Sequence, residues 1–184
     1  MTHPLSSKWT YYVSKQGKKN DTLQDYINSI KKISEMNTVE DFWAVHSHTK
    51  APSYLPPNYN LHFFRGDSRA IREDNDNENG GTFLVKLSHE AINESWQRIL
   101  LDLVREAFHP DVCGVVVHYR PNMERIVIWN KSAKNEAAKI EILRQIQNSL
   151  GLPLKSKVEY LAHKRTDGGK PQVYIMGNNG PSLE

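Results

Sequence analysis

Residues 112–130 have the sequence VCGVVVHYRPNMERIVIWN. Two apolar, β-branched runs, 114–120 and 124–130, are separated by a Pro-Asn-Met tripeptide, and this arrangement predicts a β-hairpin. Successive side chains of a strand point to opposite faces of its sheet. Ile126 and Ile128 are therefore expected on the face that packs into a core under helices.

The other face of this hairpin is expected to carry Arg125, Val127 and Trp129, and His118 and Arg120 share a face of the preceding strand. An indole stacks on a nucleobase, and a cationic base adds a cation–π attraction. Guanidinium groups bind phosphate oxygens through parallel N–H donors. These side chains suit a methylated guanosine cap, which is a cationic base joined to phosphates. The alternative is a sheet face packed against a loop, with solvated arginines.

Outside the hairpin, the hydrophobic periodicity alternates between strand and helix. The sequence predicts strands over 8–14, 82–87, 157–161 and 172–176, and helices from Thr38 onward, over 91–108 and over 134–150. Paired strands interrupted by single helices favour an α+β fold, an antiparallel sheet with helices on one face. A single domain is expected over 1–177, with polar loops at 15–25 and 163–172 and a disordered tail over 178–184.

Composition narrows the class of protein. The 184 residues fit one domain, and a net charge of +3 is compatible with a phosphate-bearing ligand. A lone cysteine, Cys113, excludes an internal disulfide and favours a reducing compartment. No apolar run approaches the ~20 residues that cross a bilayer, and neither a phosphate-cradling glycine–lysine motif nor a cysteine pair for metal binding occurs. A binding protein without cofactor or metal is expected, not an enzyme.

Several motifs resemble the translation initiation factor 4E family, whose members bind the messenger-RNA cap. They are His3-Pro4-Leu5 followed by Trp9, Thr38-Val39-Glu40-Asp41-Phe42-Trp43, Val112-Cys113-Gly114 with Arg120 and Ile126 to Trp129, and Leu150-Gly151-Leu152-Pro153. The resemblance covers residues 3 to 163. It implies a curved antiparallel sheet of about eight strands backed by three long helices, shaped like a cupped hand. The cap would lie on the concave face between two aromatic side chains.

The resemblance also implies roles for residues on the cap side. Glu73 falls where a carboxylate accepts hydrogen bonds from the guanine edge, and its alternative role is that of a turn carboxylate in an acidic loop. Arg120 and Arg125 fall at phosphate positions, and Trp129 falls where the family contacts the methyl group of the cap.

Two positions depart from the family pattern of stacking residues. Tyr26 occupies the first stacking position, as in the subgroup called the 4E homologous proteins, which can act as translational repressors. Arg72 stands where the family has its second tryptophan. A guanidinium facing a cationic base gives a partly screened repulsion, so weaker cap binding and less preference for the methylated base are expected. Alternatively, the loop moves, Arg72 meets a phosphate and another aromatic side chain fills the gap.

A second surface is implied on the convex back of the sheet. The family uses a tryptophan at the position of Trp43 to anchor helical peptides of the type Tyr-x-x-x-x-Leu-hydrophobic from scaffold or repressor proteins. Ordinary core packing is the alternative for Trp43. Arg105 stands where the family has glycine and would exclude some partners or select acidic ones. The expected partner-binding residues are His3, Pro4, Val39, Trp43, Leu101 and Arg105.

Two main hypotheses follow from these residues. The chain is a cap-binding module in translation initiation or repression, or it works mainly through its dorsal surface with cap recognition weak or lost. A third hypothesis, an enzyme such as a cap hydrolase, is not expected. The partners would be capped messenger RNA and a scaffold or repressor protein, bound by a monomer in the cytoplasm, with the nucleus as a second location. The basic loop with His163, Lys164, Arg165 and Lys170 would touch the cap phosphates or the following nucleotides, or remain solvated.

Overall fold

One antiparallel sheet organises the chain, which the computed structural model describes over residues 2–120, 124–164 and 169–184. The strands are β1 (Pro4–Lys15), β2 (Lys31–Thr38), β3 (Tyr59–Arg65), β4 (Gly81–Leu87), β5 (Val112–His118), β6 (Glu124–Asn130), β7 (Lys157–Ala162), β8 (Gln172–Ile175) and β9 (Ser182–Leu183). Their order across the sheet is β2-β1-β3-β5-β6-β4-β7-β8-β9.

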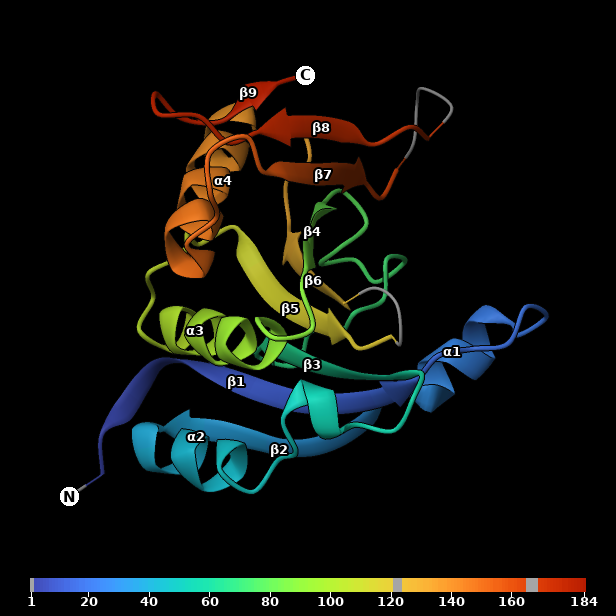
Figure 1. Cartoon of the computed structure of the whole chain (residues 1–184). Helices are drawn as coiled ribbons and strands as arrows, with labels where there is room; N and C mark the ends of the chain where they lie inside the picture. Colours follow the sequence, from blue (N-terminus) through green and yellow to red (C-terminus); the bar gives the residue numbers. More distant parts are fainter. Residues whose placement is uncertain (1, 121–123, 165–168) are drawn as a thin grey trace.

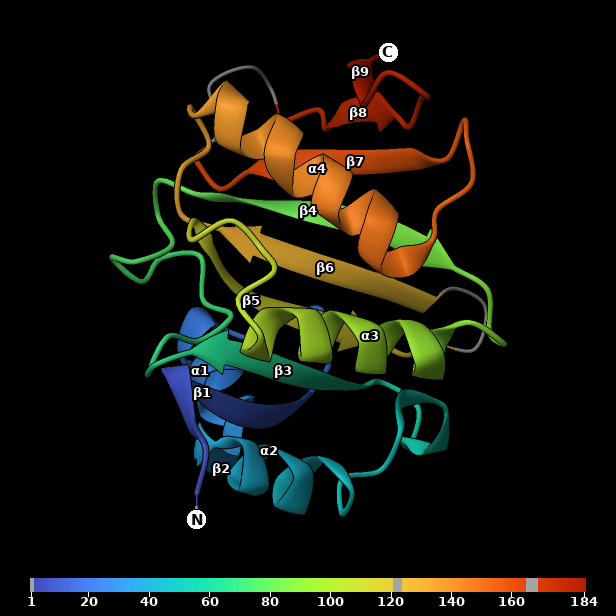
Figure 2. The same ribbon diagram turned by 90° about the vertical axis from the view of Figure 1, so that its left-hand side faces the viewer.

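The described helices lie on both sides of this sheet (Figure 1 and Figure 2). They are α1 (Leu23–Ser29), α2 (Val39–His46), α3 (Ile92–Val104) and α4 (Glu136–Leu150), with a 3-10 turn at Pro52–Tyr54. Figure 2 shows α2, α3 and α4 lying across the same face. Figure 1 shows α1 and the loop between β3 and β4 on the opposite side.

The predicted α+β fold with a curved sheet backed by helices is confirmed, with differences in detail. The described residues form nine strands instead of about eight, because short β9 adds to β8. They form four α-helices, of which only α3 and α4, with 13 and 15 residues, are long. The α2 helix has 8 residues. The tail predicted to be disordered over 178–184 instead pairs Ser182 with Ile175 and Leu183 with Tyr174.

The hairpin of β5 and β6 separates its side chains as the alternation predicts. Ile126 and Ile128 are buried in the main core between the sheet and the helices, where their strand partners are Val117 and Val115. Val127 and Trp129 belong to a second apolar cluster on the opposite face. The turn predicted at 121–123 lies outside the described residues.

Local capping signals place the helices that back the sheet. Thr38 accepts a hydrogen bond from the backbone N–H of Asp41 over 3.0 Å, and the Asp41 carboxylate accepts one from the Thr38 N–H over 3.0 Å. This reciprocal capping box starts α2 as predicted. At the end of α4, Gly151 adopts a left-handed conformation with φ of 59°, which glycine reaches without a Cβ penalty.

The remaining large side chains fill the core. Trp96 donates from Nε1 to the Tyr11 hydroxyl over 2.8 Å, and Trp9 stacks on Phe63 with centroids 4.9 Å apart, so both tryptophans are structural as expected. Cys113 is buried, and burial raises the pKa of its thiol to about 12. Over the described ranges, no helix combines the length and hydropathy needed to span a bilayer.

Candidate functional site on the concave face

The concave face holds a cleft of ≈ 930 Å³, which we call the concave cleft. Ligand-binding pockets commonly measure about 300–1,000 Å³. The walls of this cleft come from α1 and the residues before it, the loop over residues 66–80, the strands β3 to β7 and described residues before β8. The predicted cap-side residues all line it: Tyr26, Arg72, Glu73, Arg120, Arg125 and Trp129. Residues separated by a hundred positions in sequence are thus brought to one cavity.

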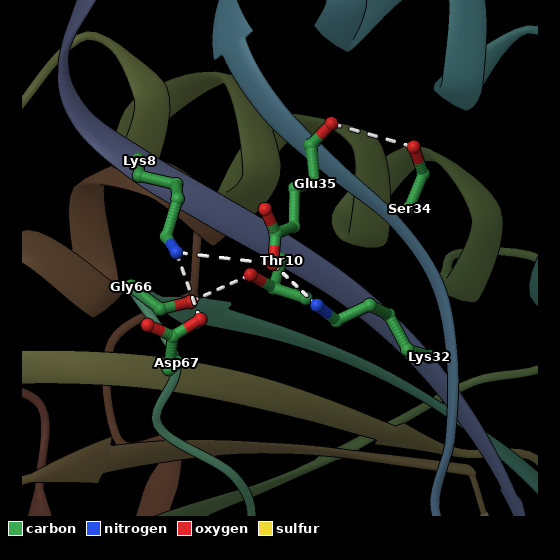
Figure 3. Close-up of polar contacts among 7 residues, drawn as sticks. All are labelled: Lys8, Thr10, Lys32, Ser34, Glu35, Gly66 and Asp67. Atoms are coloured by element: carbon green, nitrogen blue, oxygen red, sulfur yellow. Dashed lines mark hydrogen bonds and ion pairs between the residues drawn. The ribbon is translucent and has the colours of Figure 1, made fainter.

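The loop over residues 66–80, which carries Arg72 and Glu73, is fastened at its start to β1 (Figure 3). The Thr10 hydroxyl donates to the Gly66 carbonyl over 2.6 Å, and the Lys8 ammonium lies 2.8 Å from an Asp67 carboxylate oxygen. Gly66 adopts φ of 62°, a conformation that favours glycine. These contacts fix the direction in which the loop leaves β3.

A fully buried asparagine, Asn77, holds the same loop from inside. Its side-chain amide donates to the carbonyls of Arg69 and Ile71, each over 2.8 Å. These two carbonyls flank the turn just before the pair Arg72 and Glu73. A buried amide that satisfies two backbone acceptors is costly to remove, so Asn77 positions the tip of the loop. The sequence contained no sign of this role, because Asn77 is one of several polar residues in an acidic, asparagine-rich stretch.

Trp129 lies at the floor of the cleft and is held from two sides. Its ring makes an edge contact with Phe64 at 5.7 Å between centroids and a tilted contact with His163 at 4.7 Å. His163 Nδ1 lies 2.7 Å from the Asn77 carbonyl, and since a carbonyl only accepts, Nδ1 carries the proton. Trp129 is 6% exposed, and its Nε1 is buried without a hydrogen-bond partner within the described part of the chain. The indole is therefore fixed and keeps an unused donor.

The upper wall of the cleft contains Tyr26, Arg72 and Glu73. The Tyr26 hydroxyl donates to the Ala70 carbonyl over 2.7 Å, which ties α1 to the 66–80 loop. Burial raises the pKa of Tyr26 to about 12, while the positive charge of Arg72 lowers it and the negative charge of Glu73 raises it. Arg72 and Glu73 themselves are exposed. An aromatic ring, a cation and a carboxylate thus face one end of the cleft.

The other end of the cleft is built on a chain of buried polar groups. The Asn60 side-chain oxygen accepts from Arg120 over 2.8 Å and from His118 Nδ1 over 3.0 Å. Its amide donates to the Ser14 hydroxyl over 3.1 Å, and that hydroxyl lies 2.7 Å from His62 Nε2. Asn60 therefore orients the Arg120 guanidinium. The alternation of polar Asn60 and His62 with apolar neighbours in β3 is a signal that could have identified this wall.

Burial and neighbouring positive charges keep the two histidines of this polar network, His118 and His62, neutral. Burial, with smaller effects from the positive charges of Arg120 and Arg125, lowers the pKa of His118 to about 4. Burial, with a smaller effect from His118, lowers the pKa of His62 to about 3. The permanent positive charge at this end of the cleft therefore comes from the two arginines. Among the described residues, no group of three or more His, Cys, Asp or Glu side chains is arranged to hold a metal ion.

A second hollow, on the convex face, gathers most of the predicted partner-binding residues. This dorsal groove of ≈ 570 Å³ lies between α2 and α3 and is lined by Val39, Trp43, Leu101 and Arg105, together with Leu5 and Phe42. Phe42 is buried, whereas Trp43 is 43% exposed and packs edge-on against it at 5.2 Å. Trp43 is thus not an ordinary core residue.

Of the predicted dorsal residues, two lie outside the lining of this groove, and Arg105 lies within it. His3 and Pro4 are not among its lining residues; they fasten the N-terminus to α2. The His3 backbone N–H donates to the Glu40 carboxylate over 3.0 Å, and the His3 ring lies 2.6 Å from its other oxygen; these contacts lower the pKa of Glu40 to about 2. Pro4 pairs with Thr38 across β1 and β2. Arg105 ends α3 and forms an ion pair with Asp102 at 2.8 Å.

Comparisons with known proteins agree with this geometry. The family model described as eukaryotic initiation factor 4E matches residues 4–175. Human eukaryotic translation initiation factor 4E is 33% identical over 171 residues, which cover 89% of this chain and 77% of that protein. The structure of Ascaris suum eIF4E-3 with an m2,2,7G cap superposes with a TM-score of 0.83 at 25% identity and covers 94% of this chain and 98% of the other. Schistosome eIF4E complexed with m7GpppG and 4E-BP gives a TM-score of 0.79 at 26% identity, with coverage of 91% and 94%.

Proposed function

This chain belongs to the eukaryotic initiation factor 4E family, and from that membership we propose that its concave cleft binds the 7-methylguanosine cap of messenger RNA. One observation carries the proposal: the six predicted cap-side residues line a single cleft. An indole, a tyrosine ring, a carboxylate and two guanidinium groups are the groups that a cationic guanine joined to phosphates requires. Similar chains are recorded with m2,2,7G and m7GpppG caps, which supports the same ligand here.

The layout of the cleft supports one orientation of the ligand. Arg125 and Trp129 are four residues apart on β6, so strand geometry separates them by roughly 13 Å. A nucleoside at the Trp129 end would extend its phosphates toward Arg120 and Arg125. Glu73 would accept hydrogen bonds from the guanine edge, and Tyr26 would stack on one side of the base.

Arg72 makes this a weak cap site in our proposal. On the side of the base opposite Tyr26, a guanidinium would replace an aromatic ring. The positively charged base and the guanidinium repel one another, and the stacking gain of about 1–3 kcal/mol per base is reduced. We therefore expect lower affinity and less methyl selectivity than a site with two aromatic rings provides.

Fluorescence titration tests the cap proposal directly, because Trp129 lies in the cleft. Methylated and unmethylated cap dinucleotides would be titrated into the chain and into Glu73→Gln. Loss of the carboxylate should weaken binding about tenfold or more, since hydrogen bonds to a charged group contribute roughly 1.5–3 kcal/mol. Glu78→Gln is the matched control, because Glu78 lies in the same loop but does not line the cleft. Equal binding by wild type and Glu73→Gln would contradict the proposed role of Glu73.

A second candidate function rests on the exposed indole of Trp43 in the dorsal groove. In this alternative, the chain acts mainly as a protein-binding translational regulator with cap recognition weak or lost. Retention on cap resin and on an immobilised Tyr-x-x-x-x-Leu-hydrophobic peptide separates the two functions. A chain that holds the peptide and shows no cap binding at any concentration tested would support the alternative. Turnover of a cap analogue with magnesium would instead indicate an enzyme, and we expect none.

A further inference from the structure

A lysine on β4 extends the basic end of the concave cleft. In the sheet, β4 lies between β6 and β7 (Figure 2). Lys86 is the register partner of Arg125, so their Cβ atoms are about 5 Å apart across the two strands. Thr82 and Leu84 of β4 line the cleft, and strand alternation puts Lys86 on the same face. Lys86 therefore stands beside Arg125 on the concave side of the sheet.

A carboxylate holds the ammonium group of Lys86 at the cleft. Lys86 Nζ donates to Glu159 Oε1 over 2.6 Å, and Glu159, on β7, is one of the residues that line the cleft. The Lys86 side chain is still 56% exposed, so a ligand in the cleft can reach it. An ammonium group has three N–H donors, and Glu159 takes one of them. Lys86 can therefore bind an anion while it stays paired with Glu159.

The charges at this end of the cleft favour an anion. Glu159 alone would repel a phosphate, and Lys86 offsets its negative charge. Arg120 and Arg125 lie close enough to repel one another. Burial lowers the pKa of Arg120, and the positive charge of Arg125 lowers it further. A bound anion would relieve this repulsion, and the three basic side chains together with Glu159 carry a net positive charge.

The orientation proposed for the cap brings its phosphates to this group of side chains. With the base at the Trp129 end, the phosphates extend toward Arg120 and Arg125. A triphosphate carries more negative charge than two guanidinium groups offset. Lys86 is the next cation across the sheet from Arg125, and lysine, a flexible point charge, can follow a phosphate chain.

We propose that Lys86 is a third phosphate-binding residue of the concave cleft, and that it favours nucleotides with a polyphosphate chain over monophosphates. The inference rests on the proposed cap function, since the phosphates reach Lys86 only when the base occupies the Trp129 end. Glu159 acts as a positioning residue that keeps the ammonium group at the cleft. The alternative role of Lys86 is an exposed ion pair that contributes only weakly to stability.

The test compares 7-methylguanosine monophosphate with 7-methylguanosine triphosphate by fluorescence titration at low salt. The variant is Lys86→Gln. The matched control is Lys32→Gln, because Lys32 is an exposed strand lysine that pairs with Glu35 and does not line the cleft. Lys86→Gln should weaken triphosphate binding about fivefold, the size of an exposed charge contact, and change monophosphate binding by less than about twofold. Lys86→Arg keeps the charge and should retain triphosphate affinity, and added salt should reduce the loss in Lys86→Gln.

A second background separates direct contact from charge masking. In Glu159→Gln, the carboxylate that Lys86 offsets is absent. When Lys86→Gln is added to this background, triphosphate binding should still weaken by about threefold or more, because the ammonium group contacts a phosphate itself. A loss that disappears in this background would show that Lys86 only masks Glu159, and would overturn the assignment.

The remaining outcomes separate this inference from the cap function. Absence of binding of both nucleotides by wild type would overturn the cap function and this inference with it. Binding by wild type, with Lys86→Gln losing affinity equally for the two nucleotides or no more than Lys32→Gln does, would overturn the role of Lys86 alone. Unchanged monophosphate affinity in Lys86→Gln shows that the variant is folded.

Discussion

The imidazole Nδ1 of His163 lies 2.7 Å from the backbone carbonyl oxygen of Asn77. This hydrogen bond joins the segment after β7 to the loop that carries Arg72 and Glu73, and the same imidazole packs against Trp129. The floor and the upper wall of the concave cleft are therefore held as one unit. Four predictions follow from this arrangement and from the surfaces around it.

Asn77→Ala should lower both stability and cap affinity. It leaves the carbonyls of Arg69 and Ile71 without their donors, and the free energy of unfolding should fall by about 2–4 kcal/mol. Cap affinity should fall at least fivefold at a temperature where the variant is folded, because the tip of the loop is no longer fixed. Urea denaturation and cap titration measure the two effects. Asn75→Ala, at an exposed position of the same loop, should change neither, and equal behaviour of the two variants would contradict the positioning role.

Arg72→Trp should strengthen cap binding roughly tenfold or more. The indole replaces a repelling cation with a stacking surface worth about 1–3 kcal/mol, and the cation–π part of this gain favours the methylated base. Titration with methylated and unmethylated cap analogues measures both affinity and selectivity. Arg72→Ala removes the charge without adding a ring and should give a smaller gain. Weaker binding by both variants would instead indicate that Arg72 contacts a phosphate.

Trp43→Ala should weaken binding of a Tyr-x-x-x-x-Leu-hydrophobic peptide about thirtyfold or more. Truncating an aromatic anchor of this kind typically costs about 2 kcal/mol or more of binding free energy. Its cap affinity should not change, because the dorsal groove and the concave cleft lie on opposite faces of the sheet. Calorimetric titration with the peptide measures the effect. Tyr54→Ala is the control, because Tyr54 is an exposed aromatic residue outside the groove. Similar losses in both variants would count against a specific anchor.

Stability should fall as the pH falls from 6.5 to 4.5. The pKa of His118 is lowered to about 4 and that of His62 to about 3, whereas an unfolded histidine titrates near 6.5. Through this window the unfolded chain takes up protons that the folded chain does not, so the stabilisation is full above pH 6.5 and is lost on acidification. The loss should be on the order of 2–3 kcal/mol for each histidine by pH 4.5.

Urea denaturation at several pH values measures this dependence. His118→Gln should flatten the curve between pH 6.5 and 4.5, because one of the two buried imidazoles no longer titrates. His48→Gln, at an exposed position, should leave its slope unchanged. If the stability of the wild type stays constant over this range, unfolding takes up no protons, which would contradict the lowered pKa values of His118 and His62.

The sequence alone determined where several helices and strands lie and which side chains of β6 point to each face of the sheet. Alternation in β6 separated Ile126 and Ile128 from Val127 and Trp129, and the capping signals at Thr38 and Gly151 located α2 and the end of α4. These features depend on backbone periodicity and nearby hydrogen bonds, which a short stretch of chain specifies by itself. The family motifs, in addition, indicated the set of cap-side residues that line the concave cleft.

Only the tertiary structure decided how those residues are held. Asn77 orients the loop that carries Glu73, and Asn60 orients Arg120. Arg120 lies 60 residues from Asn60, and the Asn77 carbonyl meets His163 at a separation of 86 residues, so this geometry exists only after the sheet has paired. Pairing also gave order to the tail through β9, because backbone hydrogen bonds to an available strand edge require no distinctive side chains.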